Sequence, residues 1–295
     1  MQAAIGQRLL AIGLLAGFVL TATAAEKAPA SRFTNAECVS CHVQRDPQLV
    51  AAWKTSRHAR QSPKADCVAC HGASHRAASA RARRDSACTG CHEKLGREVV
   101  HSYATSKHGV IMRLEEAGYD WSQPLARGNY RAPGCAYCHL HAGEHDVSRS
   151  ITPWVPLAAP KTAVPDAELP AAMTVCVDCH APRYIAEQAG VGARMLDVAR
   201  MKLREAHDVV AHQRETLTPP DRAALDALFG GMQTHARNVR LGAGHQSPDY
   251  QWWHGQPALD GDLLRIKGAV AEQERRSLVE RARITADGNA TPGQR

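Results

Sequence analysis

The chain has 295 residues and a formal charge of +7, and aromatic residues make up only 5% of it. Its three phenylalanines are too few for an ordinary hydrophobic core, and no segment after residue 25 is apolar enough to span a membrane. Because the basic residues are scattered, with RARR at 81–84 as the one short cluster, we expect no nucleic-acid binding.

The first 25 residues have the three parts that are typical of a secretory signal. MQAAIGQR carries one arginine, LLAIGLLAGFVL at 9–20 is apolar, and TATAA at 21–25 offers small residues for cleavage. The apolar run is shorter than the roughly 20 residues of a membrane span, which argues against an uncleaved anchor. We therefore expect 1–25 to be a signal peptide and the mature protein to be periplasmic or otherwise exported.

All ten cysteines occur in five C-x-x-C-H pentapeptides, namely CVSCH (38–42), CVACH (67–71), CTGCH (88–92), CAYCH (135–139) and CVDCH (176–180). This run is the attachment signature of c-type haem, in which both thiols form thioethers and the adjacent histidine becomes the proximal iron ligand. Zinc knuckles and redox C-x-x-C motifs are alternatives, but five knuckles do not pair off, and redox motifs rarely repeat five times in one chain.

We therefore predict five covalently attached c haems, which would also offset the positive charge through their propionates. The predicted thioether cysteines are Cys38, Cys41, Cys67, Cys70, Cys88, Cys91, Cys135, Cys138, Cys176 and Cys179. The predicted proximal ligands are His42, His71, His92, His139 and His180.

Eleven further histidines raise the question of the sixth iron position. A second imidazole there gives bis-histidine ligation, whereas an iron without one could bind a small molecule. Local pattern selects five distal candidates: TSRHA and TSKHG repeat one motif, HGASH and GEHD follow proximal histidines, and GAGH breaks a helix. These candidates are His58, His75, His108, His145 and His245. The others are expected to be solvated or packed (His207, His212, His235) or to bind propionates (His101, His141, His254).

The distribution of motifs predicts a mainly α protein, with haem-packed short helices and loops followed by a long-helix C-terminal bundle. We expect a five-haem domain at 26–182, in which residues 152–172, with five prolines, form an extended connection. A helical bundle at 183–284 should pack on the haems, and 285–295 should be a disordered tail.

Three helices are expected in that bundle. Leu196, Ala199, Leu203, Ala206 and Val210 recur at helical spacing, as do Leu225, Leu228, Met232, His235 and Val239. TPPD at 218–221 should start the second helix with Thr218 as N-cap, GAGH at 242–245 should end it, and a third should cover about 258–284.

Over residues 37–254 the chain resembles the multihaem cytochromes of the hydroxylamine oxidoreductase type. The resemblance is carried by ECVSCHVQRDPQLVAAWKTSRHA, CVACHGASH, CTGCHEKLGREVVHSYATSKHG, APGCAYCHLHAGEHDVSRSITPW, VCVDCHAPRY, LREAHDVV and GAGHQSPDYQWWHG. It implies that the histidines matching His58, His75, His108, His145 and His245 are distal ligands.

The chain also departs from that family. The family enzymes carry eight haems, and the units without a counterpart here include the one with the open catalytic iron. Leu203 stands where their cross-linking tyrosine would be, so activity is not carried over. The related pentahaem nitrite reductases use a C-x-x-C-K motif, whereas all five motifs here end in histidine.

Two functions follow as hypotheses. The first is a periplasmic pentahaem cytochrome that passes electrons through bis-histidine haems to other cytochromes or to a membrane quinone-linked complex. The alternative is an oxidoreductase that acts on hydroxylamine, nitrite or a related nitrogen compound at one open haem, with His141, His207, His235, His254 and Asp146 as proton donors. A weaker hypothesis is a haem-rich subunit that only docks to a larger complex, and self-association into a homo-oligomer stays open.

Overall fold

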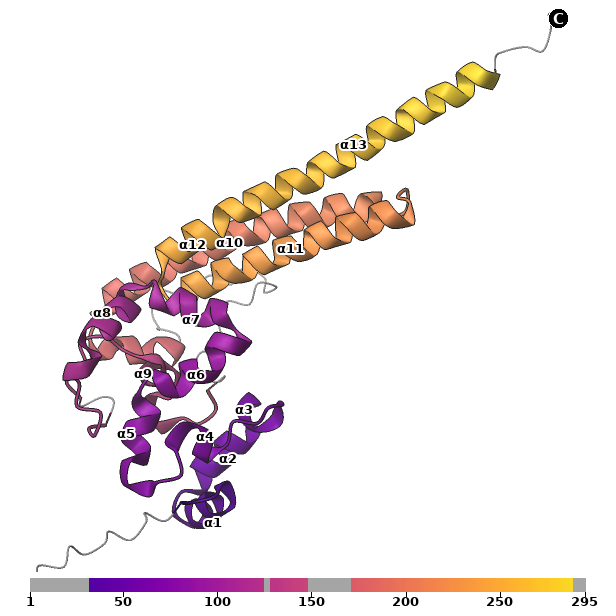
Figure 1. Cartoon of the computed structure of the whole chain (residues 1–295). Helices are drawn as coiled ribbons and strands as arrows, with labels where there is room; N and C mark the ends of the chain where they lie inside the picture. Colours follow the sequence, from indigo (N-terminus) through magenta and orange to yellow (C-terminus); the bar gives the residue numbers. More distant parts are fainter. Residues whose placement is uncertain (1–31, 125–127, 148–170, 289–295) are drawn as a thin grey trace, which may run out of the picture. The chain divides into compact units, whose positions relative to one another are not determined.

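A computed structural model describes residues 32–124, 128–147 and 171–288, and in these ranges the regular elements are all helices (Figure 1). The mainly α prediction is confirmed. The predicted signal peptide and nearly all of the proline-rich connection at 152–172 lie outside the described residues. No helix in the described ranges is long and apolar enough to cross a membrane.

The first two ranges contain short helices joined by tight turns. They are α1 (Asn35–Arg45), α2 (Pro47–Thr55), α3 (Arg57–Arg60), α4 (Cys67–His71), η1 (His75–Ala77), α5 (Ala78–Arg83), α6 (Ser86–Leu95), α7 (Arg97–Ala104), α8 (Lys107–Glu115), η2 (Glu116–Gly118), α9 (Cys135–His139) and η4 (His141–Gly143).

Capping residues explain why these helices are short. Asp46 ends α1 and caps α2 by accepting from the Leu49 amide, with Pro47 at the first helical position. Ser56 likewise ends α2 and caps α3. One side chain thus stops a helix and starts the next, so the chain changes direction every two or three turns.

The last range begins with η5 (Ala171–Asp178) and continues with four helices: α10 (Pro182–Gln213), α11 (Pro219–Gly244), α12 (Pro248–His254) and α13 (Gln256–Gly288). The three predicted long helices correspond to α10, α11 and α13, although α13 starts earlier and ends later than predicted. Figure 1 shows these three side by side, and each packs against the other two.

The predicted apolar stripes face the core between these helices. Leu196, Ala199, Ala206 and Val210 of α10 meet Leu225, Met232 and Val239 of α11 and Leu259 and Ile266 of α13. Each fully buried large apolar side chain contributes about 1.5–3 kcal/mol to stability, so this bundle has a core of its own.

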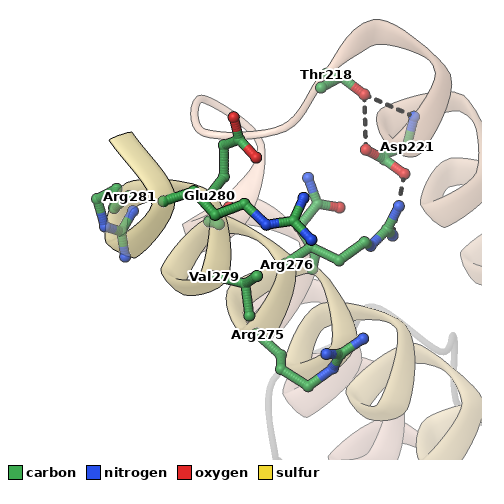
Figure 2. Close-up of a pocket in the computed structure, with 10 residues that line it drawn as sticks. Thr218, Asp221, Arg275, Arg276, Val279, Glu280 and Arg281 are labelled. Carbon is green, nitrogen blue, oxygen red and sulfur yellow. Dashed lines mark hydrogen bonds and ion pairs between the residues drawn. The ribbon is translucent and has the colours of Figure 1, made fainter. Parts of the chain in front are cut away.

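Thr218 begins α11 as the sequence predicts. Its side chain accepts from the Asp221 amide and donates to the Asp221 carboxylate at 2.7 Å. The same carboxylate lies 3.5 Å from the guanidinium of Arg276 on α13, so the cap also ties two helices together (Figure 2).

The end of α11 positions His245. Gly244 is the last helical residue, the Gln246 amide donates to Ala243 O, and the Ser247 amide donates to Gly242 O. This is a Schellman end, and its left-handed position holds Gln246 at φ 53° rather than the usual glycine. The turn carries His245 away from the helix and toward the short helices.

Candidate functional site

The C-x-x-C-H motifs lie in helical segments. Four of them are on α1, α4, α6 and α9, and the fifth overlaps the end of η5. Residues three and four apart share one face of a helix, so two thiols and one imidazole of a motif point the same way. All ten thiols are free of disulfides, as haem attachment requires.

Successive motifs are neighbours in space. Burial, followed by Cys38 of the first motif, raises the pKa of the Cys67 thiol in the second. The pKa of Cys70 is raised to about 11 by burial and then by Cys88 and Cys91 of the third motif.

The later motifs continue the series. Cys88 and Cys135 hydrogen-bond each other through their side chains. Burial, followed by Cys176 of the fifth motif, raises the pKa of Cys138 to about 12. Each motif is therefore close enough to the next one in the sequence to affect its thiols.

Each motif histidine lies beside one of the five distal candidates. The ring centres are 6.4 Å apart for His42 and His75, 6.1 Å for His92 and His58, 6.2 Å for His71 and His145, and 6.0 Å for His180 and His108. His245 is close enough to His139 to lower its pKa, which burial already depresses, to about 4. Ring distances thus define four pairs, and the effect of His245 on the pKa of His139 points to a fifth.

The spacing of the rings tests whether a metal fits between them. Two imidazoles on opposite sides of one metal, with metal–nitrogen bonds of about 2 Å, have ring centres roughly 6 Å apart. The four ring distances, 6.0 to 6.4 Å, agree with this value. The paired residues therefore fit a six-coordinate haem iron.

Hydrogen bonds to Nδ1 leave the other ring nitrogen available. Nδ1 lies 3.2 Å from Ala78 O in His71 and 2.7 Å from Gly143 O in His145. A carbonyl can only accept, so Nδ1 carries the proton and Nε2 is the free ligand atom. Burial, followed by His145, lowers the pKa of His71, which favours the neutral ring that a metal ligand needs.

Ser102 fixes His245 in the same way. Its hydroxyl donates to Val99 O at 2.9 Å and lies 2.7 Å from Nδ1 of His245. Because the single hydroxyl proton is used by the carbonyl, the imidazole Nδ1–H donates to the serine oxygen. Ser102 is fully buried, and it was not among the residues predicted from the sequence.

The repeated TSRHA and TSKHG patterns are two copies of one helix start. Ser56 caps α3 and donates to Trp53 O at 2.6 Å; Ser106 caps α8 and donates to Tyr103 O at 2.7 Å. Both serines are 1% exposed. His58 and His108 each lie two residues after the buried cap, which holds them in the first turn.

Two residues that the sequence analysis missed join neighbouring motifs. The Asn35 side chain accepts from the Cys67 amide at 3.1 Å, and Asp85 accepts from the Cys135 amide at 2.7 Å. Each lies three residues before the first cysteine of one motif and binds the first cysteine of another. That shared position is the signal that could have identified them.

The Asp85 contact substitutes for a missing cap. The residue before α9 is Gly134, which has no side chain to cap it, and Asp85 makes no cap on its own helix α6. A side chain at 134 would collide with the Asp85 carboxylate, so this approach requires glycine. Asp85 therefore caps α9 from a different motif.

The remaining histidines have other partners. His235 is half-buried, and its Nδ1 hydrogen-bonds the Asp262 carboxylate at 2.5 Å, so a polar partner rather than apolar packing holds it. His207 and His212 are exposed on α10. His141 lies 4.0 Å from Asp178, whose carboxylate also accepts from Tyr137 at 2.8 Å.

A second group of aromatic and imidazole rings lies where α7 meets α12. His101 is 5.1 Å from His254 and 5.4 Å from Tyr250, measured between ring centres. His101 and His254 are both exposed.

Two protein families match this chain. Residues 48–218, more than half of it, match the family described as seven times multi-haem cytochrome CxxCH. Residues 20–72 match the family of cytochrome c554 and c-prime. Both matches span motifs that the geometry above brings together.

A solved structure has a similar fold. A chain of the reducing HAO-like protein complex from Kuenenia stuttgartiensis matches with a TM-score of 0.53 and 18% identity, covering 84% of this chain and 87% of that chain. At this identity the likeness shows the fold, and the expected resemblance to the hydroxylamine oxidoreductase type is confirmed at that level.

Proposed function

Because the chain belongs to the multihaem cytochromes with CxxCH motifs, we propose that it is an exported electron carrier with five haems, each held between two histidines. Family membership gives covalent haem c and electron transfer. What we propose beyond this is the number of haems, the histidine ligands of each iron and the export of the protein. Bound haem c supplies an iron that accepts or donates one electron, and the protein sets its potential through ligands and surroundings.

The assignment of ligands rests on the five histidine pairs. We assign His42 with His75, His71 with His145, His92 with His58, His139 with His245 and His180 with His108 to one iron each. The ten motif cysteines hold the porphyrins. The single observation that carries this assignment is the ring spacing, since it fits an iron in each of the four pairs whose distances are known.

A carrier is favoured over an enzyme because every motif histidine has an imidazole opposite it. Action on hydroxylamine or nitrite needs an iron with a free side. Leu203, at the position of the family's cross-linking tyrosine, packs against the apolar core of the bundle. Neither observation therefore supports an open catalytic iron.

The order of the motifs supports a conducting series. The electrostatic effects of Cys38 on Cys67, of Cys88 on Cys70, of Cys135 on Cys88 and of Cys176 on Cys138 link each motif to the next. Electrons would therefore enter near one end and leave near the other. The name of the structural neighbour refers to a protein complex, which supports redox proteins as partners here.

The export part of the proposal rests on the N-terminal signal pattern and on haem attachment taking place outside the bacterial cytoplasm. Cleavage after about residue 25 would be read from the N-terminal sequence of the mature protein.

Low-temperature EPR of the oxidised protein, with an optical test for carbon monoxide binding after reduction, examines the proposal directly. Five low-spin irons and no uptake of carbon monoxide are expected, together with a protein mass that contains five haems. One high-spin iron, or one that binds carbon monoxide, would replace the carrier with an enzyme, and hydroxylamine and nitrite would then be assayed.

A further inference from the structure

The basic residues are spread along the chain, but the net positive charge is concentrated at one end of the motif series, where acidic residues are few. Residues 32–84, which hold the first two motifs, contain ten Lys and Arg against three Asp and Glu. Residues 85–147 contain six against eight, and residues 171–288 contain fifteen of each. The excess therefore belongs to α1–α5 and their turns.

These basic side chains are available at the surface. Nine of the ten are exposed; the exception, Arg83, donates to Trp121 O and Ser122 O. Within the described residues no ion pair joins any of the ten to a carboxylate.

The three carboxylates of this part are used elsewhere. Glu37 accepts from Thr34, Asp46 from the Leu49 amide, and Asp66 from the Ala69 amide. Each caps a helix start, where a negative charge is favourable. Within this described part, the three carboxylates therefore do not pair with its Lys and Arg side chains.

Haem propionates would reduce this excess without removing it. Two haems add about four carboxylates, which leaves a surplus of about three positive charges, while haems at the other motifs make the rest of the haem region more negative. The difference in charge between the two ends of the series therefore persists in the loaded protein.

The basic surface is carried by the helix of the first motif, α1, and by the helices and turn that follow it. Helix α1 packs against α2 and α4, α2 packs against α3, and the Trp53 indole donates to Ala65 O at 3.0 Å. Val43, next to His42, is 42% exposed, and Phe33, 37% exposed, has its ring centre 5.9 Å from that of His75. Apolar side chains beside a redox centre with a charged rim are typical of a docking face.

We infer that this basic surface, made by α1–α3 and the turn to α4, is the docking site of an acidic electron-transfer protein. The inference rests on the proposed function. It specifies the end of the haem series at which a partner protein binds. One electron then passes between the partner's redox centre and the haem of the first motif. Opposite charge steers such an encounter and raises its rate by about 10- to 1,000-fold at low salt.

The test uses the haem-loaded protein and reduced plant-type ferredoxin, an acidic donor whose potential is about −400 mV. Its reduced cluster loses one electron and a ferric haem gains it, as followed by stopped-flow absorbance. The patch variant replaces Arg45, Lys54, Arg57 and Lys64 by Gln, because none of these side chains has a hydrogen-bond or ion-pair partner in the described residues. The binding constant for oxidised ferredoxin is measured alongside.

The control variant removes the same charge elsewhere, by replacing Arg275, Arg276, Arg281 and Arg283 of α13 by Gln. These side chains line a shallow pocket near Thr218 (Figure 2). At about 10 mM salt we expect the patch variant to react at least about 10-fold more slowly and bind at least about 10-fold more weakly, with the difference vanishing near 500 mM. The control should stay within about two-fold of the unmodified protein.

Equal slowing in both variants would mean that net charge alone matters and would overturn the inference, as would no slowing in the patch variant. Vesicles with anionic phosphatidylglycerol are a second probe. If the patch variant loses vesicle binding but keeps its rate with ferredoxin, the surface binds lipid and the inference fails. Haem content and EPR are measured on each sample. If the proposed function fails, the haem content or the EPR spectrum differs from the expected one, but the salt dependence of the rate does not change. These two measurements therefore distinguish that failure from a failure of the docking inference.

Discussion

Ser102 shows how one buried hydroxyl can orient His245, which we propose as a haem ligand. Its oxygen accepts from Nδ1 of His245 while its proton goes to Val99 O. Residues that orient a metal ligand in this way typically contribute 10- to 100-fold to metal affinity. In Ser102→Ala we expect His245 to detach more readily from reduced iron.

The measurement is carbon monoxide uptake by the reduced protein. Ser102→Ala should bind carbon monoxide at one haem, whereas the unmodified protein and Ser277→Ala, a control on α13, should bind none. If Ser102→Ala excludes carbon monoxide and its EPR spectrum is unchanged, the hydrogen bond does not hold His245 in place.

Asp85 offers a test of docking between motifs. Asp85→Ala removes the acceptor from the Cys135 amide, whereas Asp85→Asn keeps an acceptor and removes only the charge. Loss of a helix cap costs about 0.5–2 kcal/mol, so we expect that loss in Asp85→Ala and little change in Asp85→Asn. Urea unfolding followed by circular dichroism measures both, and equal losses would indicate that charge matters rather than the hydrogen bond.

At the scale of the element, the start of α11 should be sensitive to acid. The hydrogen bond from Thr218, assisted by Arg276, lowers the pKa of Asp221 below its ordinary value of 3.8. A lowered folded-state pKa means that the stabilisation is complete above 3.8 and is lost as pH falls through the folded value.

Asp221→Asn should therefore melt at a lower temperature than the unmodified protein at neutral pH. The difference should shrink toward an acid pH at which folded Asp221 is protonated, because both side chains are then uncharged. Thermal unfolding followed at helical wavelengths gives both values. A difference that is the same at both pH values would mean that the carboxylate charge plays no part.

The long helices and the site differ in how far sequence can predict them. The stripes Leu196–Val210 and Leu225–Val239 point to the core because helical periodicity is a local property. The five distal candidates could also be chosen locally, through repeated patterns such as the capped starts at Ser56 and Ser106.

Their partners could not be predicted. His58 follows His42 by sixteen residues yet faces His92, and His75 follows His71 by four yet faces His42. These pairs depend on packing between separate helices, which leaves no periodic signal. The contacts of Asn35 and Asp85 with distant cysteines are of the same kind.

At the scale of the molecule, apolar side chains are unevenly distributed. The bundle of α10, α11 and α13 shares one buried cluster, whereas the short helices have a smaller one around Met112, Tyr119 and Trp121. The short helices must therefore obtain most of their stability from bound porphyrin, as small metal domains do from their metal. We expect the bundle, which has its own buried cluster, not to depend on haem in this way.

Expression in the bacterial cytoplasm, where haem is not attached, separates these two parts. We expect trypsin to degrade residues 32–147 of the haem-free chain and to leave a helical fragment that begins near Pro182, identified by mass spectrometry. The haem-loaded protein, digested in parallel, should resist trypsin in both the short helices and the bundle. If the short helices of the haem-free chain resist trypsin as well as the bundle does, their own side chains are enough to stabilise them. Porphyrin would then not be their core.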